Sequence, residues 1–368
     1  MSHLGEFELI GRIAASCHPE RSEGSHPSGV LGIGDDCAVL PQREGLDTLV
    51  TTDLLIEGRH FLLADVTPEQ LGWKSAAVNI SDIAAMGGKP VASFLSIALP
   101  KGLAERFSTG PDPSENVASL PLPSLMGPSR SKPRAAMPSE GSAPPENRSC
   151  WIDRFMKGYS ELCGKFGVPL LGGDTSASPS ELFINVTVIG ECPHGRALLR
   201  SSARPGDLIC VTGPLGDSAA GLKLILENAK DASPELVCRH YLPMPRVEEG
   251  IALRECPGVH AMMDISDGIA SDLRHILEAS GAGAEIELAE VPLSGEMRAV
   301  CEERGWDAAE LAVSGGEDYE LLVTMAPEAL DRARNALNGR LFVIGRIVEG
   351  DGIRWIGGNK EYKGFTHF

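Results

Sequence analysis

The chain has 368 residues, and its composition excludes several classes of protein. Lys+Arg 33 against Asp+Glu 51 gives a formal net charge of −18, which disfavours binding to nucleic acid and to anionic membranes. Nine cysteines without a C-x-x-C pair indicate reduced thiols rather than a disulfide framework or a zinc site. The N-terminus lacks the basic region of a signal peptide, and no stretch reaches the roughly 18 apolar residues of a membrane span. We therefore expect a cytoplasmic protein.

Two polar segments interrupt an otherwise periodic chain, one at residues 17–29 and a longer one, rich in Pro and Ser, at about 108–149. We interpret both as mobile insertions, because long loops cost little entropy and need not mark a domain boundary. The remainder alternates strand and helix patterns. Strands are expected at 48–53, 93–99, 182–189, 207–212, 259–264, 284–288, 319–325 and 341–348. Helices are expected at 67–86, 151–166, 217–228, 267–280 and 327–337.

This alternation predicts an α+β fold of the two-layer α/β kind, and the length of the chain predicts two domains. A break in the pattern at residues 190–205 separates one run of elements from a fresh strand. We place the boundary there. The N-terminal domain then covers residues 1–195, with the insertion at about 108–149, and the C-terminal domain covers 196–368.

Carboxylates stand beside glycines or at strand ends throughout the chain, and each alone is more often a helix cap or a turn residue. Asp82 is different. Apolar residues recur at helical spacing through position 82, so a cap there would cut one helix in two. Asn79 and Asp82 are three residues apart and share a face of that helix. Asp82 is therefore predicted to project from inside a helix as a ligand.

Other aspartates follow apolar runs that are typical of strands, namely Asp53, Asp174 and Asp264. Ligands bind at the carboxyl ends of strands in sheets flanked by helices, so these side chains are expected to converge. Two carboxylates about 4 Å apart repel by about 4 kcal/mol at an effective dielectric of 20, and such a cluster demands cations. An all-oxygen ligand set favours Mg²⁺, which keeps open positions for water and phosphate oxygens. A polyphosphate substrate is implied, with Ser266 and nearby amides expected to meet phosphate.

A set of motifs, in chain order, resembles one enzyme family: GIGDDCAVL, TTDLLIEGRHF, WKSAAVNISDIAAMGGKP, LLGGDTS, ALLRSSARPGD, VTGPLGDSAAGL, MDISDGIASDL, SGGEDYELL and YKGFTHF. They are similar to those of the thiamine-monophosphate kinases, in the superfamily of aminoimidazole ribonucleotide synthetase and selenophosphate synthetase. The resemblance covers nearly the whole chain outside the two insertions. It implies a homodimer whose N-terminal sheets form a barrel-like core, with ATP and several Mg²⁺ ions held between N- and C-terminal domains. It also implies the reaction: the γ-phosphoryl of ATP passes directly to thiamine monophosphate, giving thiamine diphosphate.

The resemblance also implies roles for individual residues. Magnesium ligands would be Asp36, Thr51, Thr52, Asp53, Asp82, Asp174, Asp264 and Asp267. ATP would contact Gly173, Asp174, Arg200 and Ser266, and thiamine monophosphate would contact His60, Glu317 and Tyr362. Asp82, Asp264 and Arg200 would act on the reacting phosphates, while a metal role for Asp35 stays open. Because a phosphate acceptor is already ionised, such a site needs metal ligands more than acid or base groups.

Two alternatives remain. One is another ATP-dependent synthetase of the same superfamily, although residues 1–31 offer only Cys17, in a polar insert, as a reactive thiol of the selenophosphate synthetase kind. The other is a protein that binds Mg-nucleotide without catalysis, in which the acidic cluster stabilises the fold or a dimer.

Overall fold

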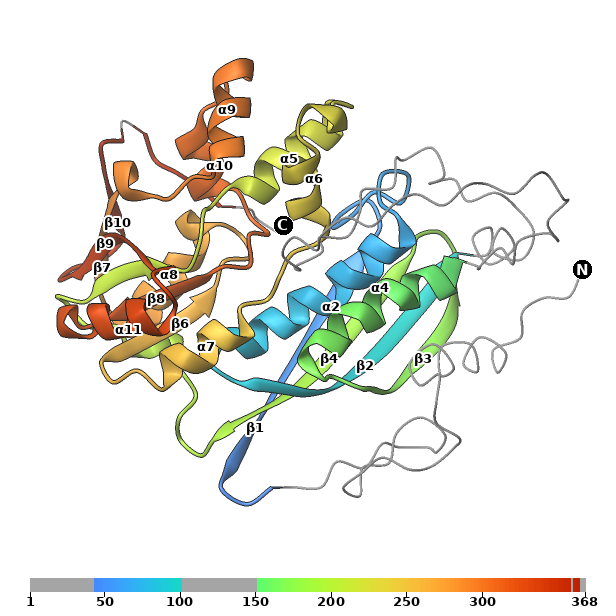
Figure 1. Ribbon diagram of the computed structural model, residues 1–368, viewed down its shortest axis with the longest axis horizontal. Helices are drawn as coiled ribbons and strands as arrows, with labels where there is room; N and C mark the ends of the chain where they lie inside the picture. The colour runs from blue at the N-terminus through green and yellow to red at the C-terminus, as the bar shows by residue number, and fades with distance from the viewer. Residues whose placement is uncertain (1–42, 101–150, 359, 365–368) are drawn as a thin grey trace, which may run out of the picture.

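The computed structural model describes residues 43–100, 151–358 and 360–364 (Figure 1). The expectations for segments 17–29 and 108–149, and for Asp35 and Asp36, concern residues outside these ranges. Within the described ranges no helix is long and apolar enough to cross a membrane.

The N-terminal part is a four-stranded sheet with two helices on one face (Figure 1). The strands are β1 (Leu46–Ile56), β2 (Lys89–Pro100), β3 (Leu170–Ser178) and β4 (Phe183–Pro193), in the order β1-β4-β2-β3. The helices are α2 (Pro68–Ala85) and α4 (Trp151–Phe166). Side chains alternate along β1, so that Leu49 and Leu55 are buried while Val50 and Leu54 are 66% and 48% exposed on the opposite face.

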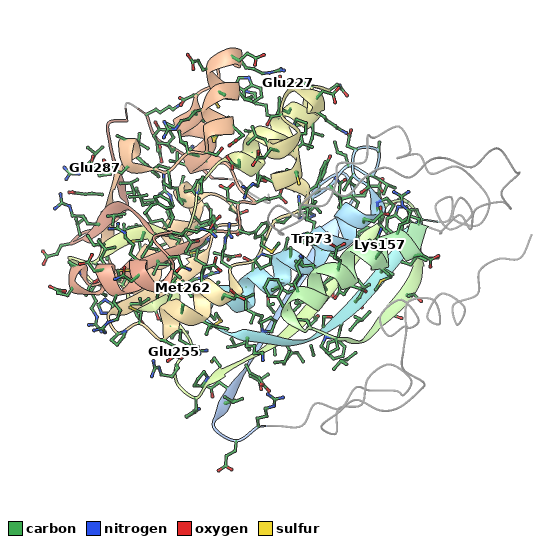
Figure 2. All side chains as sticks on the ribbon, viewed as in Figure 1. Trp73, Lys157, Glu227, Glu255, Met262 and Glu287 are labelled. Atoms are coloured by element: carbon green, nitrogen blue, oxygen red, sulfur yellow. The ribbon has the colours of Figure 1, made fainter. Side chains whose placement is uncertain are left out.

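Helix α2 begins at a capping box, in which Thr67 and Gln70 bond each other's backbone amides, with Pro68 in the first turn. Nearly every side chain of this helix is buried, because α2 lies between the four-stranded sheet and the C-terminal part. Trp73 lies near the middle of the molecule (Figure 2), and its Nε1 donates to the carbonyl oxygen of Pro243 at 2.7 Å. The helix is thus a structural element of both halves.

The C-terminal part is a six-stranded mixed sheet in the order β10-β7-β9-β5-β8-β6. Its strands are β5 (Leu208–Val211), β6 (Val259–Asp264), β7 (Gly283–Glu287), β8 (Leu321–Met325), β9 (Phe342–Val348) and β10 (Ile353–Ile356). Its α-helices are α5 (Asp217–Leu226), α6 (Pro234–Tyr241), α7 (Val247–Arg254), α8 (Ile269–Ser280), α9 (Gly295–Arg304), α10 (Ala308–Ser314) and α11 (Leu330–Ala336). Helices α7 and α11 pack on one face of this sheet and α8 packs on the other.

The expected strands and helices are confirmed, with ends shifted by a few residues. The helix expected at 327–337 is a 3₁₀ turn, Pro327–Ala329, followed by α11. The apolar run before Asp174 is a strand as expected, but β3 continues through Asp174 to Ser178. Strand β10 and helices α6, α7, α9 and α10 were not predicted. The first sheet ends at Pro193 and the second begins at Leu208. The predicted domain boundary after residue 195 lies between these two residues and stays a prediction.

Candidate active site

Two cavities open beside the C-terminal half of α2, and they share the side chains of Asp82 and Asp264. Cavity 1, of about 610 Å³, is also lined by Asp53, His60 and Glu317. Cavity 2, of about 480 Å³, is also lined by Thr51 and by Arg200 of the 3₁₀ turn η2 (Arg200–Ser202). Two ligands could therefore meet at one carboxylate wall.

That wall is the acidic cluster, by which we mean Asp53 on β1, Asp82 on α2 and Asp264 at the end of β6. Three contacts fix it. The hydroxyl of Thr51 donates to Oδ2 of Asp82, and the hydroxyl of Ser81 donates to Oδ2 of Asp264 at 2.6 Å. The amide of Asp53 donates to Oδ1 of Asn79 at 3.0 Å. As expected, Asp82 projects from inside a continuous helix and Asp264 ends a strand.

The members of the acidic cluster hold protons more tightly than ordinary aspartates. Burial, with the nearby charge of Asp82, raises the pKa of Asp53 to about 6. Burial and the same neighbour raise the pKa of Asp264 to about 7. Burial also raises the pKa of Asp82, although the Thr51 hydroxyl and Arg200 oppose that rise. Without a cation the cluster is therefore a site of electrostatic repulsion.

The donor set fits a hard divalent cation, because it consists of carboxylate and hydroxyl oxygens. Within the described residues no three His, Cys, Asp or Glu side chains form a group that could hold one ion by themselves. An ion here would bind one or two carboxylates and keep positions for water and phosphate oxygens, which is the usual coordination of Mg²⁺.

We expect magnesium to stabilise the protein more as the pH rises. Asp53 and Asp264 keep protons in the folded metal-free state at pH values where the unfolded chain has lost them. The free energy of unfolding of the metal-free protein therefore falls as pH rises from the unfolded pKa near 4 towards about 7. Magnesium needs the ionised carboxylates and reverses this loss. Thermal melts with and without Mg²⁺ over this range check it, and a gain in Tm that is independent of pH would contradict it.

Two loops beside the acidic cluster contact each other through their backbones. They are the ISDG turn, residues 265–268, and the SGGEDY loop, residues 314–319. The amide of Glu317 donates to the carbonyl of Ser266 at 2.7 Å. A side chain on Gly316 would lie 2.4 Å from that same carbonyl oxygen, and one on Gly268 would lie 2.6 Å from the carbonyl oxygen of Gly315. Glycine is thus required at both positions by the close approach of the two backbones.

The sequence predicts that the amides of the ISDG turn bind phosphate, and the structure gives them another partner. The amides of Ser266 and Asp267 each donate to Oδ2 of Asp272, at 3.1 Å, so these two groups satisfy a carboxylate of the protein itself. Ser266 and Asp267 still line cavity 1 with their other atoms.

Some of the other residues predicted to bind ligands line cavity 1, and others lie outside both cavities. His60 lines cavity 1, and its Nδ1 accepts from the amide of Ile56 at 2.9 Å, which makes Nε2 the donor nitrogen of the neutral ring. Tyr362 is 4% exposed, packs edge-to-face on Trp355 and lines neither cavity.

Gly173 and Asp174 also line neither cavity. Sheet register puts Asp53 opposite Val186, Val186 opposite Leu95, and Leu95 opposite Gly173. Three strand spacings of ~4.8 Å separate the ends of this row by roughly 14 Å. Asp174 of the same chain therefore cannot share an ion with Asp53.

Four buried or half-buried residues of the site were not predicted: Lys74, Ser81, His240 and Asp272. Lys74 had a signal in the sequence. It precedes Asp82 by eight residues, close to two helical turns, and so lies on the same side of α2. Ser81 is part of the NISD segment, whereas His240 has no neighbouring pattern that marks it.

Comparison with known proteins agrees with this geometry. The AIR synthase related N-terminal domain matches residues 34–116 and 131–192, and the corresponding C-terminal domain matches 204–357. The chain therefore belongs to the AIR synthase related family, whose two domains carry the two sheets described above.

Within that family it is a member of the thiamine-monophosphate kinases. It is 36% identical to the thiamine-monophosphate kinase of Escherichia coli K12 over 99% of this chain and 98% of that protein. The crystal structure of thiamine-monophosphate kinase from Stenotrophomonas maltophilia K279a is 32% identical, with a TM-score of 0.73 over 96% of each chain. AaThiL complexed with AMPPCP and TMP is also 32% identical, with a TM-score of 0.71 over 100% of this chain and 98% of that one.

Proposed function

We propose that this protein transfers the γ-phosphoryl group of ATP directly to thiamine monophosphate, in a magnesium-dependent reaction that yields thiamine diphosphate and ADP. The observation that carries the proposal is the pair of cavities with Asp82 and Asp264 in common. Two bound substrates would bring their phosphates together at the carboxylates that the two cavities share. Direct transfer between them needs no covalent intermediate on the protein.

We assign ATP to cavity 2 and thiamine monophosphate to cavity 1. Arg200 lines cavity 2 and brings positive charge beside Asp82, where the phosphates of a nucleotide would lie. Cavity 1 offers His60, whose Nε2–H suits a phosphate oxygen, and the carboxylate of Glu317, which suits the cationic ring. Exposed leucines at Leu62, Leu222 and Leu226 line the same cavity and give the rings of the acceptor apolar surface.

The reaction requires the protein to align two anions and does not require it to transfer a proton. Mg²⁺, bound through the acidic cluster, would screen the phosphate charges from each other. Thr51 and Ser81 hold the carboxylates of Asp82 and Asp264 in one orientation, so that the ligands are placed before substrate arrives. Arg200 supplies a fixed positive charge on the nucleotide side.

We also propose that the protein acts as a homodimer in which β1 of one copy lies beside β3 of the other. Both are edge strands of the four-stranded sheet, and the face that carries Val50 and Leu54 is exposed. The two sheets would then form a barrel-like core. Thr52 on β1 and Asp174 on β3 are both exposed, so this pairing of edge strands would bring Thr52 of one copy and Asp174 of the other towards each other.

Mixing two inactive variants tests this assembly. Asp82→Asn and Asp174→Asn are each expected to be inactive, but a dimer of one of each contains one site with both carboxylates intact. Random exchange at equal amounts gives half mixed dimers, so about a quarter of the activity should return. If Asp174 acts within its own chain, the mixture stays inactive.

Purified protein incubated with ATP, Mg²⁺ and thiamine monophosphate should give thiamine diphosphate and ADP in equal amounts, measured by chromatography. A protein that binds Mg-nucleotide without catalysis would give neither product. Another synthetase of the superfamily would consume ATP only with a different acceptor. No disulfide joins the cysteines that the structure describes, which supports a reducing compartment, and we place the reaction in the cytoplasm.

A further inference from the structure

A buried lysine, Lys74, lies next to Glu317 but does not line cavity 1. Lys74 on α2 has a side chain that is 1% exposed, and its Nζ lies 2.8 Å from Oε1 of Glu317. Lys74 itself does not line the cavity, whereas Glu317 does. Since a buried ammonium group is costly unless it is paired, this ion pair ties the N-terminal helix to the SGGEDY loop of the other domain.

The second oxygen of the same carboxylate is also engaged. Oε2 of Glu317 lies 3.3 Å from Nδ1 of His240, and the hydroxyl of Ser218 lies 3.0 Å from that nitrogen. Nδ1 of His240 thus lies between the carboxylate of Glu317 and the hydroxyl of Ser218. Burial, together with Lys74, lowers the pKa of His240 to about 3, and the imidazole is therefore neutral. The ring therefore adds no positive charge beside Glu317.

Glu317 is thereby held as an oriented anion. Burial alone would raise its pKa, but the positive charge of Lys74 and the hydrogen bond that it donates act against burial, and the pKa of Glu317 is lowered. Its backbone has a φ of +65°, which a non-glycine residue adopts only when its surroundings impose it, here through the bond to Ser266. Tyr319 of the same loop is the other titratable neighbour, and its pKa is raised well above the ordinary range by burial, with the charge of Glu317 adding to the effect.

The surroundings of this carboxylate decide what it recognises. Val78, Leu222 and Tyr241 line cavity 1 with it. An ionised oxygen among apolar groups favours a positive charge that carries no strong hydration shell, such as a quaternary ring nitrogen. Each carboxylate oxygen keeps a second lone pair for that contact after Lys74 and His240 are satisfied.

We propose that Lys74 is a positioning residue: from the N-terminal domain it fixes the orientation of Glu317, so that cavity 1 selects an acceptor with a cationic heterocycle over a neutral one of the same shape. The inference rests on the proposed function, since it concerns the acceptor of that reaction. Lys74 acts only through Glu317, because it lies behind that residue and outside the lining of the cavity.

The test compares two acceptors. One is thiamine monophosphate, and the other is its deaza analogue, in which carbon replaces the charged ring nitrogen. We expect the unchanged protein to show a KM at least about tenfold lower for the cationic acceptor, since ~1.4 kcal/mol of selective attraction corresponds to tenfold. Glu317→Gln should remove the preference in KM for the cationic acceptor, and Lys74→Met should remove most of it. Lys74→Arg, which keeps the charge, should retain most of it, while KM for ATP stays unchanged throughout.

A double-mutant cycle isolates the path through Glu317. In a Glu317→Gln background, Lys74→Met should change neither the ratio nor the KM for thiamine monophosphate further. This comparison remains available if Lys74→Met alone does not fold, because the double variant buries no unpaired charge. A tenfold difference between the double variant and Glu317→Gln would overturn the proposal.

Two other outcomes would also overturn it: a folded Lys74→Met protein with an unchanged ratio, or one that binds thiamine monophosphate more tightly. Failure of the unchanged protein to make any thiamine diphosphate would instead fall on the proposed function. An active unchanged protein with no preference for the cationic acceptor would fall on this inference alone.

Discussion

Asp82→Asn is expected to reduce kcat by about 10³-fold while raising the Tm of the metal-free protein. Turnover falls because Asp82 lines both cavities and an amide is a poorer ligand for a divalent ion. Stability rises because one of three mutually repelling carboxylates is removed, which lowers the pKa of Asp264 towards its ordinary value. Steady-state kinetics and thermal melts in a chelator measure the two effects together.

Asp217→Asn is the matched control for that variant. Burial raises the pKa of Asp217 as well, and its carboxylate accepts from the hydroxyl of Ser294 at 2.6 Å, but it lines neither cavity. Asparagine can accept the same hydrogen bond, so turnover should stay close to that of the unchanged protein. Equal losses in both variants would mean that buried carboxylates matter here for folding alone, and would remove the assignment of Asp82 to the reaction.

Gly268→Ala is expected to destabilise the protein by about 3 kcal/mol. Gly268 caps the N-terminus of α8 with a φ of +94° and a ψ of 148°, a conformation almost confined to glycine. The added methyl group would also lie 2.6 Å from the carbonyl oxygen of Gly315. The melting temperature should fall by about 4 °C for a chain of this length, and the displaced SGGEDY loop should bind the acceptor less tightly.

Gly281→Ala, at the other end of the same helix, distinguishes the effect of backbone strain from that of steric crowding by the added methyl group. Gly281 has a φ of +66° and a ψ of 43°, and an added methyl group would meet nothing within 4 Å. Only the left-handed conformation is penalised there, at about 1 kcal/mol. If the two alanine variants melt alike and both stay active, the close approach of the two loops is not what fixes the site.

Much of the fold was predictable because its elements carry strong local patterns. Helix α2 was expected at 67–86 and spans Pro68–Ala85, since its apolar residues repeat at helical spacing and its capping box marks the start. The two faces of β1 differ in burial, and β4 alternates buried with half-buried positions. Strand β3 was expected to end before Asp174, because Gly172 and Gly173 interrupt its apolar pattern, whereas the strand continues to Ser178. Helices α6 and α7 were missed because each has only 8 residues.

The candidate site was predictable only as far as local spacing reaches. Asp82 could be placed on a helix, and Asp264 at a strand end, from their immediate neighbours. That Thr51 and Ser81 would hold these carboxylates depends on how β1, α2 and β6 pack, and no local pattern encodes that packing. The same limit applies to the pairing of Lys74 with Glu317, which joins residues from the two domains across 243 positions.

The bond from Tyr319 to Ile265, 2.9 Å long, spans 54 positions of the chain and joins the two loops at the bottom of the site. We expect a contact of such sequence separation to form late in folding, because closing the intervening chain costs entropy. It also opens late: the amides of Glu317 and Tyr319 should exchange hydrogen with solvent only when the whole C-terminal sheet opens. We therefore expect the acceptor pocket to be lost together with the C-terminal sheet, and a nascent chain to gain it only after β8 has left the ribosome.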